Sequence, residues 1–234
     1  MNITPFLRSA AVAVLVLAAA SPMPAQSEAA PAGDRYVYAD FQNLQDGRLV
    51  SAHGGMTRLN RYAQNMANAP KMRGLENADP PAPAAARGNA NDPNISAAFE
   101  YELRMPNEWA GVNLEVFGRA AQGGKLVPDD LSAYKFITMQ IFAKGPKSIR
   151  LELITRGQGV DLEAGYPGAI FRITPGFNTY KLELDKFRQP QWATQLNLKK
   201  DVLGKLTSVT VGVGCDKCEP ETGTVVIDNI AFEK

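Results

Sequence analysis

The chain has 234 residues with 25 basic side chains, 24 acidic side chains and one histidine, which gives a net charge of +1. This length suits one domain with a sizeable core. Binding to nucleic acid depends on clustered Lys and Arg, so interspersed charges of both signs argue against a nucleic-acid partner. The single histidine, His53, excludes any site that needs two histidine ligands.

The first 25 residues are typical of an export signal. Arg8 is their only charged side chain, residues 9–20 are apolar or small, and prolines then precede a small residue at Ala25. A run of about twelve such residues is shorter than the roughly twenty that a helix needs to cross a bilayer. We therefore predict a signal peptide over residues 1–25, a periplasmic or extracellular location and no membrane span. Cleavage would remove one base and no acid, leaving a neutral chain.

The mature chain is expected to begin with a flexible segment and to continue as one domain. Residues 26–33 are small and polar, which is typical of a disordered start, and residues 34–234 form the predicted domain. Within it, residues 60–94 are rich in Asn, Ala and Pro and keep no helical or strand period. So long an irregular insertion is expected to be functional, mobile, or both.

Alternation of apolar and polar residues predicts strands along most of the domain. Phe99, Tyr101 and Leu103 would face one side of a strand, whereas the residues between them would face water. Other β-prone runs occur at residues 35–41, 48–51, 112–117, 134–142, 148–154, 169–173, 179–184, 206–213 and 224–232. All these runs together give roughly ten short strands, without long amphipathic helices between them. This pattern indicates an all-β fold, an antiparallel β-sandwich or jelly roll.

Aromatic residues are the first candidates for ligand binding. Trp109 and Trp192 each lie near a proline in a predicted connecting segment. A flat ring with a polar edge suits the apolar face of a pyranose, but for either indole taken alone the core of the sandwich is the favoured place. Four tyrosines are further candidates for stacking on a sugar: Tyr62, Tyr134, Tyr166 and Tyr180.

Cys215 and Cys218 lie in the predicted loop between the last two strands. In an exported protein two cysteines so close in sequence are expected to form a disulfide. Closing so short a loop contributes about 2 kcal/mol by the chain-entropy estimate. A redox pair would need a thioredoxin-like context, and a metal site would need two more ligands.

The sequence offers little catalytic chemistry. No Gly-x-Ser-x-Gly elbow lies between a strand and a helix, and paired carboxylates would meet in space rather than in sequence. The remaining acid/base set is His53, Tyr166 and Arg172, which leaves a jelly-roll polysaccharide lyase or hydrolase as an alternative. We predict no catalytic residues and a protein that is not an enzyme.

Five segments of the C-terminal half carry a family resemblance. The segments are residues 180–184, 185–187, 190–192, 206–211 and 223–232, the last containing Ile-Asp-Asn-Ile. They are similar to the galactose-binding-like jelly rolls, and within these to carbohydrate-binding module family eleven and the related complex I intermediate-associated proteins. The resemblance covers roughly the last hundred residues.

The resemblance implies a non-catalytic protein that holds a carbohydrate or polysaccharide on a concave β-sheet face. It also implies a structural calcium ion at Asp40 and Asp228, because first and last strands meet in such modules and calcium prefers oxygen ligands. In these modules an acidic residue is common at the position that Gln42 occupies in this chain. The complex I relatives imply a different function, that of an assembly factor with an envelope protein partner. One fold hosts many functions, so both stay open here.

Overall fold

The structure is a computed structural model that describes residues 33–42, 44–45, 48–49, 56–64, 71–73, 85–86, 95–117, 128–156, 162, 164–214 and 220–234. Several predictions fall elsewhere in the chain. The signal peptide, nearly all of the flexible start, His53, Cys215 and Cys218 lie outside the described residues.

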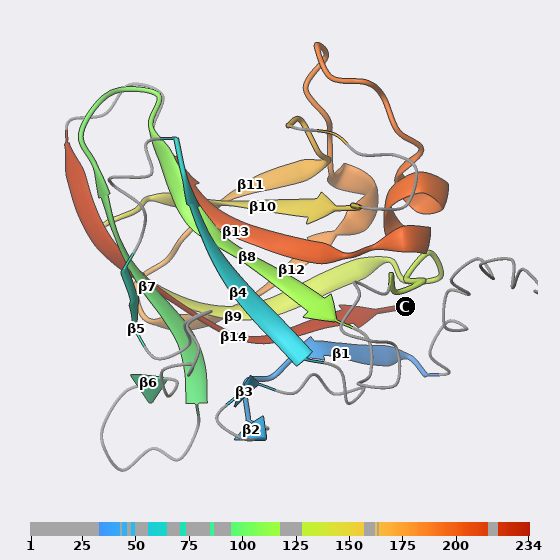
Figure 1. The fold of residues 1–234 in the computed structure, drawn as a ribbon, viewed down its shortest axis with the longest axis horizontal. Helices are drawn as coiled ribbons and strands as arrows, with labels where there is room; N and C mark the ends of the chain where they lie inside the picture. The colour runs from blue at the N-terminus through green and yellow to red at the C-terminus, as the bar shows by residue number, and fades with distance from the viewer. Residues whose placement is uncertain are drawn as a thin grey trace, which may run out of the picture.

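Two antiparallel sheets form the domain (Figure 1). The seven-stranded sheet has the order β12 (Phe177–Glu183), β9 (Phe136–Lys144), β14 (Glu221–Glu233), β7 (Ile95–Leu103) and β5 (Lys71–Arg73), with β1 (Arg35–Ala39) paired to β14 and β6 (Ala85–Ala86) paired to β7. The five-stranded sheet has the order β11 (Gly168–Arg172), β10 (Ser148–Ile154), β13 (Ser208–Gly214), β8 (Trp109–Phe117) and β4 (Met56–Ala63). A small hairpin joins β2 (Leu44–Gln45) to β3 (Arg48–Leu49).

The core lies between the two sheets and follows the period of two along each strand. On β7 the predicted inward residues Phe99, Tyr101 and Leu103 are buried, whereas Glu102 is exposed. Each fully buried Leu, Ile or Val side chain contributes about 1.5–3 kcal/mol relative to an exposed one. The five-stranded sheet supplies mainly aliphatic residues: Val112, Leu114, Ile149, Leu151, Leu153, Val209, Val211 and Val213.

Helical structure in the described part is confined to one connection. Three short helices, η3 (Leu184–Lys186), η4 (Leu198–Val202) and η5 (Leu203–Lys205), lie between β12 and β13. The Asn197 side chain caps η4 by accepting a hydrogen bond from the Lys200 backbone amide. Within the described ranges no helix combines the length and apolar character needed to cross a membrane.

The prediction of an all-β antiparallel sandwich is confirmed. Each of the ten predicted strands coincides at least in part with an observed strand. The eight-residue strand β4 was not predicted, because its sequence MTRLNRYA interrupts apolar residues with Arg and Asn. Among the described strands β4 pairs with β8 alone, at the end of the five-stranded sheet. The short strands β5 and β6 fall within the interval 60–94 that was expected to be irregular.

Candidate functional site

Strand pairing places five residues in one row across the outer face of the five-stranded sheet. From β4 to β11 the row reads Tyr62, Gly111, Gly212, Arg150 and Ile170. Their sequence neighbours on β8, β10 and β13 are core residues, so the row faces away from the core. The two adjacent glycines leave the middle of this face without side chains.

Tyr62 fills the space above the glycines. A β-carbon on either Gly111 or Gly212 would collide with the Tyr62 hydroxyl, so the phenol lies across β8 and β13. The ring of Trp109 lies beside it, with centroids 5.4 Å apart and planes inclined by 40°. Trp109 is 44% exposed. Together Tyr62 and Trp109 form a pair of tilted, adjacent rings, here called the aromatic platform.

An ion pair lies next to the platform in the same row. Arg150 donates from Nε to Glu152 Oε1 at 2.8 Å, and its Nη2 lies 2.7 Å from the same oxygen. Burial, together with the nearby Glu152 carboxylate, raises the pKa of the Tyr62 phenol, which Arg150 opposes. Tyr62 therefore keeps its proton at neutral pH and can donate a hydrogen bond. The Arg150 side chain is more exposed than its partner, at 42% against 20%.

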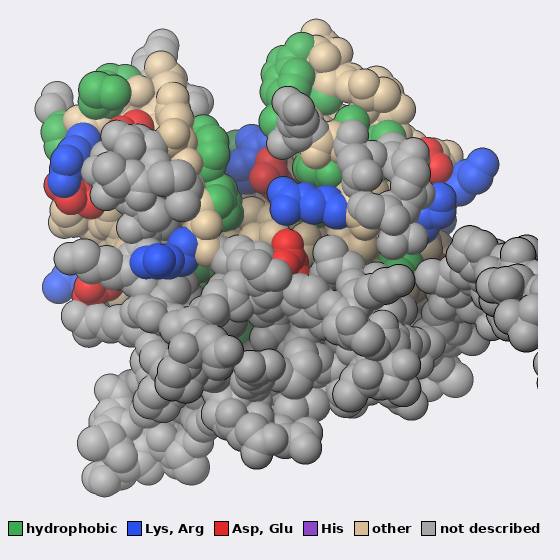
Figure 2. All heavy atoms as spheres, viewed as in Figure 1, with side chains coloured by type: hydrophobic (Ala, Val, Ile, Leu, Met, Phe, Trp, Pro, Cys, Tyr) green, Lys and Arg blue, Asp and Glu red, His purple; other side chains and the backbone are tan. Residues whose placement is uncertain are grey.

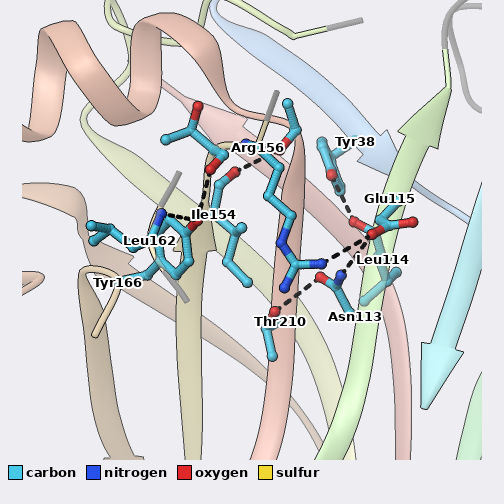
Figure 3. A network of polar contacts seen from close by, with 11 residues as sticks. Tyr38, Asn113, Leu114, Glu115, Ile154, Arg156, Leu162, Tyr166 and Thr210 are labelled. Carbon is cyan, nitrogen blue, oxygen red and sulfur yellow. Dashed lines mark hydrogen bonds and ion pairs between the residues drawn. The ribbon is translucent and has the colours of Figure 1, made fainter. Parts of the chain in front are cut away.

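A chain of polar contacts lies beside this row (Figure 3). Thr210 donates to Asn113 Oδ1 at 2.9 Å, and Asn113 donates to Glu115 Oε1 at 3.1 Å. The Arg156 side chain extends from the end of β10 to Glu115 on β8, with Nη1 3.7 Å from Oε1. We call these four residues the polar floor. Glu115 is nearly buried, whereas its partner Arg156 is half-exposed.

The face is hollowed. In Figure 2 two elevations stand on either side of a depression in which Lys or Arg and Asp or Glu side chains gather. In the same view, the loop between β12 and β13 forms one elevation and the β7–β8 hairpin forms the other (Figure 1). Trp192 belongs to the loop and is 73% exposed. Both indoles thus lie at the surface, and the expectation that they pack in the core is wrong.

The tyrosines predicted for stacking occupy different places. Tyr62 belongs to the aromatic platform, but Tyr166 is 3% exposed, donates to the Thr155 carbonyl at 2.9 Å and accepts from the Leu162 amide at 3.0 Å (Figure 3). Tyr134 belongs to the core, and Tyr180 packs on Phe171 with ring centroids 5.1 Å apart. The structure thus brings Tyr62, but not Tyr166, to the hollowed face.

The predicted acid/base set is not assembled by the described residues. Tyr166 is tied to two backbone groups two residues before β11, and Arg172 is the last residue of that strand. Tyr166 therefore lies just before the first residue of β11 and Arg172 lies at the other end of that strand.

Asp40 and Asp228 have hydrogen-bond partners in this structure. Asp228 is fully buried and accepts from the Asn229 amide at 2.7 Å and from the Ser96 hydroxyl at 3.3 Å, one donor for each carboxylate oxygen. Asp40 accepts from the Gln42 amide at 3.2 Å. Among the residues that the structure describes, no three His, Cys, Asp or Glu side chains cluster as metal ligands. Calcium at this pair stays a prediction of the resemblance.

Sequence reasoning missed the polar groups of the face. Alternation along the strands marks Glu115 and Glu152 only as not pointing to the core. The signal that could have found one pair is the spacing of opposite charges at Arg150 and Glu152, which are two apart on one strand and so share a face. The contacts of Arg156 with β8 depend on strand order, which no local pattern gives.

Comparison with known proteins gives matches in structure only. No protein-family model matches the chain, and no curated protein matches it in sequence. The structure is similar to the family 11 carbohydrate-binding module of a cellulosomal cellulase of Clostridium thermocellum, with 12% identity, a TM-score of 0.53 and coverage of 88% of this chain and 96% of that one.

A second solved structure is a family 11 carbohydrate-binding module from Clostridium thermocellum in complex with a β-1,3-1,4-mixed-linked tetrasaccharide. Here the identity is 15%, the TM-score is 0.51, and the match covers 85% of this chain and 95% of that one. The assembly-factor alternative and its envelope protein partner stay predictions. With a match over nearly the full length of both modules, the chain has the jelly-roll fold of the family 11 carbohydrate-binding modules.

Proposed function

We propose that this protein binds a carbohydrate chain on the hollowed outer face of the five-stranded sheet and does not cleave it. The observation that carries the proposal is the aromatic platform, in which Tyr62 lies over two glycines beside the Arg150 and Glu152 ion pair. A partly exposed aromatic platform next to polar groups matches the apolar C–H face and the hydroxyl groups of a sugar ring.

The chemistry of the face suits a pyranose. The apolar C–H face of the sugar would stack on Tyr62 and Trp109, where aromatic contacts contribute about 0.5–1.5 kcal/mol beyond area burial. Sugar hydroxyls both donate and accept, so they can pair with the guanidinium of Arg150 and the carboxylate of Glu152. Because the side chains of the polar floor bind one another, and Arg150 binds Glu152, these side chains are held in place before the ligand arrives.

The fold supports the choice of a first ligand. One structurally similar module is described in complex with a mixed-linked β-1,3-1,4 tetrasaccharide. Mixed-linked β-glucan is therefore the first probe for this protein, alongside a panel of other neutral and acidic polysaccharides.

Export is part of the proposal. The signal-like residues 1–25 would deliver the protein to the periplasm or the exterior, where polysaccharides are met and where Cys215 and Cys218 would be oxidised to a disulfide. Mass spectrometry of the secreted protein tests both points. We expect an N-terminus at residue 26 and a mass two hydrogens below that of the reduced chain.

Affinity gel electrophoresis of the purified protein tests binding. We expect retardation by at least one polysaccharide of the panel, and weakening of the affinity by roughly three- to tenfold in Tyr62→Ala and in Trp109→Ala. Lys181→Ala, on the exposed side of β12 in the other sheet, is the control, and the polysaccharide should reduce its mobility by the same fraction as that of the wild type. Retardation by no member of the panel would contradict binding, and release of shorter saccharides would contradict the absence of catalysis.

A further inference from the structure

The loop that carries Trp192 is held together by two glutamine side chains. Gln189 donates from Nε2 to the carbonyls of Gly165 at 2.9 Å and Thr194 at 3.0 Å, and its Oε1 accepts from the Leu196 amide at 2.7 Å. Gln195 donates to the carbonyls of Pro190 at 3.0 Å and Ala193 at 2.8 Å. We call residues 188–196 the Trp192 loop.

The Trp192 loop is also fixed to the sheet. Arg188 and Gly168 exchange two backbone hydrogen bonds of 2.9 Å, which joins the start of the loop to β11. Gly165 has a φ of +83°, and a β-carbon there would lie 3.0 Å from the Cη2 atom of Trp192 and closer still to Ala193. The edge of the indole therefore rests on a backbone position that favours glycine.

In spite of this ordering, Trp192 points its ring into solvent. Fixing the backbone of each loop residue costs about 1–2 kcal/mol of conformational entropy. Because the indole is 73% exposed, burial of this ring offsets little of that free energy. Ordered, exposed aromatic rings are typical anchors of binding surfaces, because few rotatable bonds remain to be fixed when a ligand arrives. The loop thus has the geometry of a binding element.

The Trp192 loop lies beyond β11, which is three strands across the sheet from β8, the strand that carries Trp109. The loop belongs to one of the two elevations beside the hollow (Figure 2). Gly168, to which it is bonded, pairs with Glu152 of β10, so the loop adjoins the ion pair. About four strand spacings, on the order of 19 Å, separate β8 from a position beyond β11. The platform and Trp192 are therefore too far apart for one sugar ring to contact both.

We propose that Trp192 is a second stacking subsite for the same glycan chain, which the protein contacts at both ends of the hollow. The inference rests on the proposed function and specifies its ligand class. A sugar unit extends a chain by about one strand spacing, roughly 5 Å, so a saccharide of about four or more units reaches both subsites. Shorter saccharides occupy the aromatic platform alone.

Isothermal titration with mixed-linked β-1,3-1,4-glucan trisaccharide and hexasaccharide tests this length dependence. In Trp192→Ala the Kd for the hexasaccharide should rise roughly three- to tenfold, the scale of one aromatic contact. The Kd for the trisaccharide should stay at the wild-type value. Trp192→Phe, which keeps an aromatic ring, should recover most of the hexasaccharide affinity. Met105→Ala is the matched control, because Met105 is also exposed, at 60%, on the opposite elevation.

Gln189 is a positioning residue in this scheme. Gln189→Glu removes the donor to two carbonyls while keeping the shape, so it should weaken hexasaccharide binding and leave trisaccharide binding unchanged. In a Trp192→Ala background the same substitution should have no additional effect on either Kd. A purely structural role would weaken both saccharides alike.

The outcomes separate the two proposals. Equal loss of trisaccharide and hexasaccharide in Trp192→Ala, or no loss for the hexasaccharide, would overturn the second subsite while carbohydrate binding stands. If the wild-type protein binds neither saccharide nor any polysaccharide of the panel, the proposed function is overturned and the subsite with it.

Discussion

The Tyr62 hydroxyl occupies the space that a side chain at Gly212 would fill, two strands away in the same sheet. This relationship ties the strand β4 to β13 although the two strands do not pair. It also lets the phenol extend across β8 to β13. The position of Tyr62 in the aromatic platform therefore depends on the absence of a β-carbon at Gly212.

Gly212→Ala should displace Tyr62. Forcing a methyl group into an occupied space costs about 1–3 kcal/mol, so the free energy of unfolding measured in urea should fall by that amount. Carbohydrate affinity should fall in parallel, because the displaced ring no longer keeps its place beside Trp109.

Two variants sharpen that experiment. Gly214→Ala on the same strand is the matched control, since a β-carbon there meets Trp109 Cβ at an ordinary 3.5 Å and should change neither stability nor affinity. Tyr62→Phe removes the atom that collides, so Gly212→Ala should cost less in that background. Additive effects of the two substitutions would argue against the contact.

Removing Glu115 should destabilise the protein more than removing its partner Arg156. Glu115→Ala leaves the Asn113 amide without its buried acceptor, at a cost of about 1–3 kcal/mol. Arg156→Ala removes a half-exposed ion pair of 3.7 Å and should cost under about 1 kcal/mol. Urea unfolding of the single and double variants measures both values and their coupling, and a larger cost for Arg156→Ala would contradict the burial asymmetry.

The sequence predicts the strands well, but it predicts poorly which side chains meet on the outer face of the five-stranded sheet. Both results have one physical reason. Alternation is local, so the period of two at Phe99, Tyr101 and Leu103 marks an inward face without knowledge of the partner strand. The aromatic platform is not local, since Tyr62 and Trp109 come from strands that are far apart in sequence and meet only through the pairing of β4 with β8. That pairing was hidden because β4 itself carries no clear alternation.

The two indoles illustrate the same limit. Trp109 begins a strand and Trp192 lies in a loop, and in either context an isolated sequence favours burial of so large a ring. What exposes Trp192 is the set of glutamine contacts that order its loop, and these depend on the position of Gly165 in another segment. The sequence could therefore name both tryptophans as candidates for ligand binding, but it could not predict their exposure.

Tyr166→Phe should lower stability without changing carbohydrate affinity. The hydroxyl bridges the Thr155 carbonyl and the Leu162 amide while the ring is buried, so its loss leaves two backbone groups with one partner fewer, at about 1–3 kcal/mol. Thermal unfolding and affinity gels on the same sample check the two expectations. A loss of affinity at unchanged stability would instead return Tyr166 to the set of ligand-binding residues.

Alkaline pH should destabilise the protein. Burial raises the pKa of Tyr38, Tyr62 and Tyr101 above the usual phenol value of 10.0. In the unfolded chain these phenols lose their protons near pH 10, while the folded state retains them, so stability is complete below that pH and falls above it. Each affected tyrosine adds a slope of up to about 1.4 kcal/mol per pH unit.

Urea unfolding of the wild type and of Tyr62→Phe from about pH 8 to about pH 11 measures that slope. We expect the wild type to lose stability more steeply than the variant above about pH 10. Parallel curves would show that Tyr62 ionises as readily in the folded state as in the unfolded chain.

Chelation tests the calcium ion that the resemblance implies at Asp40 and Asp228. Because each Asp228 oxygen faces a hydrogen-bond donor, we expect the same Tm in EDTA and in excess calcium. Asp228→Asn should lower the Tm in both buffers, since its amide would place a donor against a donor. A Tm that rises with calcium in the wild type but not in Asp228→Asn would establish the ion.

The exposure of both indoles has a practical consequence for spectroscopy. The chain has two tryptophans, and because Trp109 and Trp192 are both in contact with water in the folded state, unfolding should barely shift the emission maximum. Circular dichroism is then the better probe of folding. For the same reason intrinsic fluorescence reports almost entirely on what covers the two rings, so a blue shift on adding a saccharide would register its arrival.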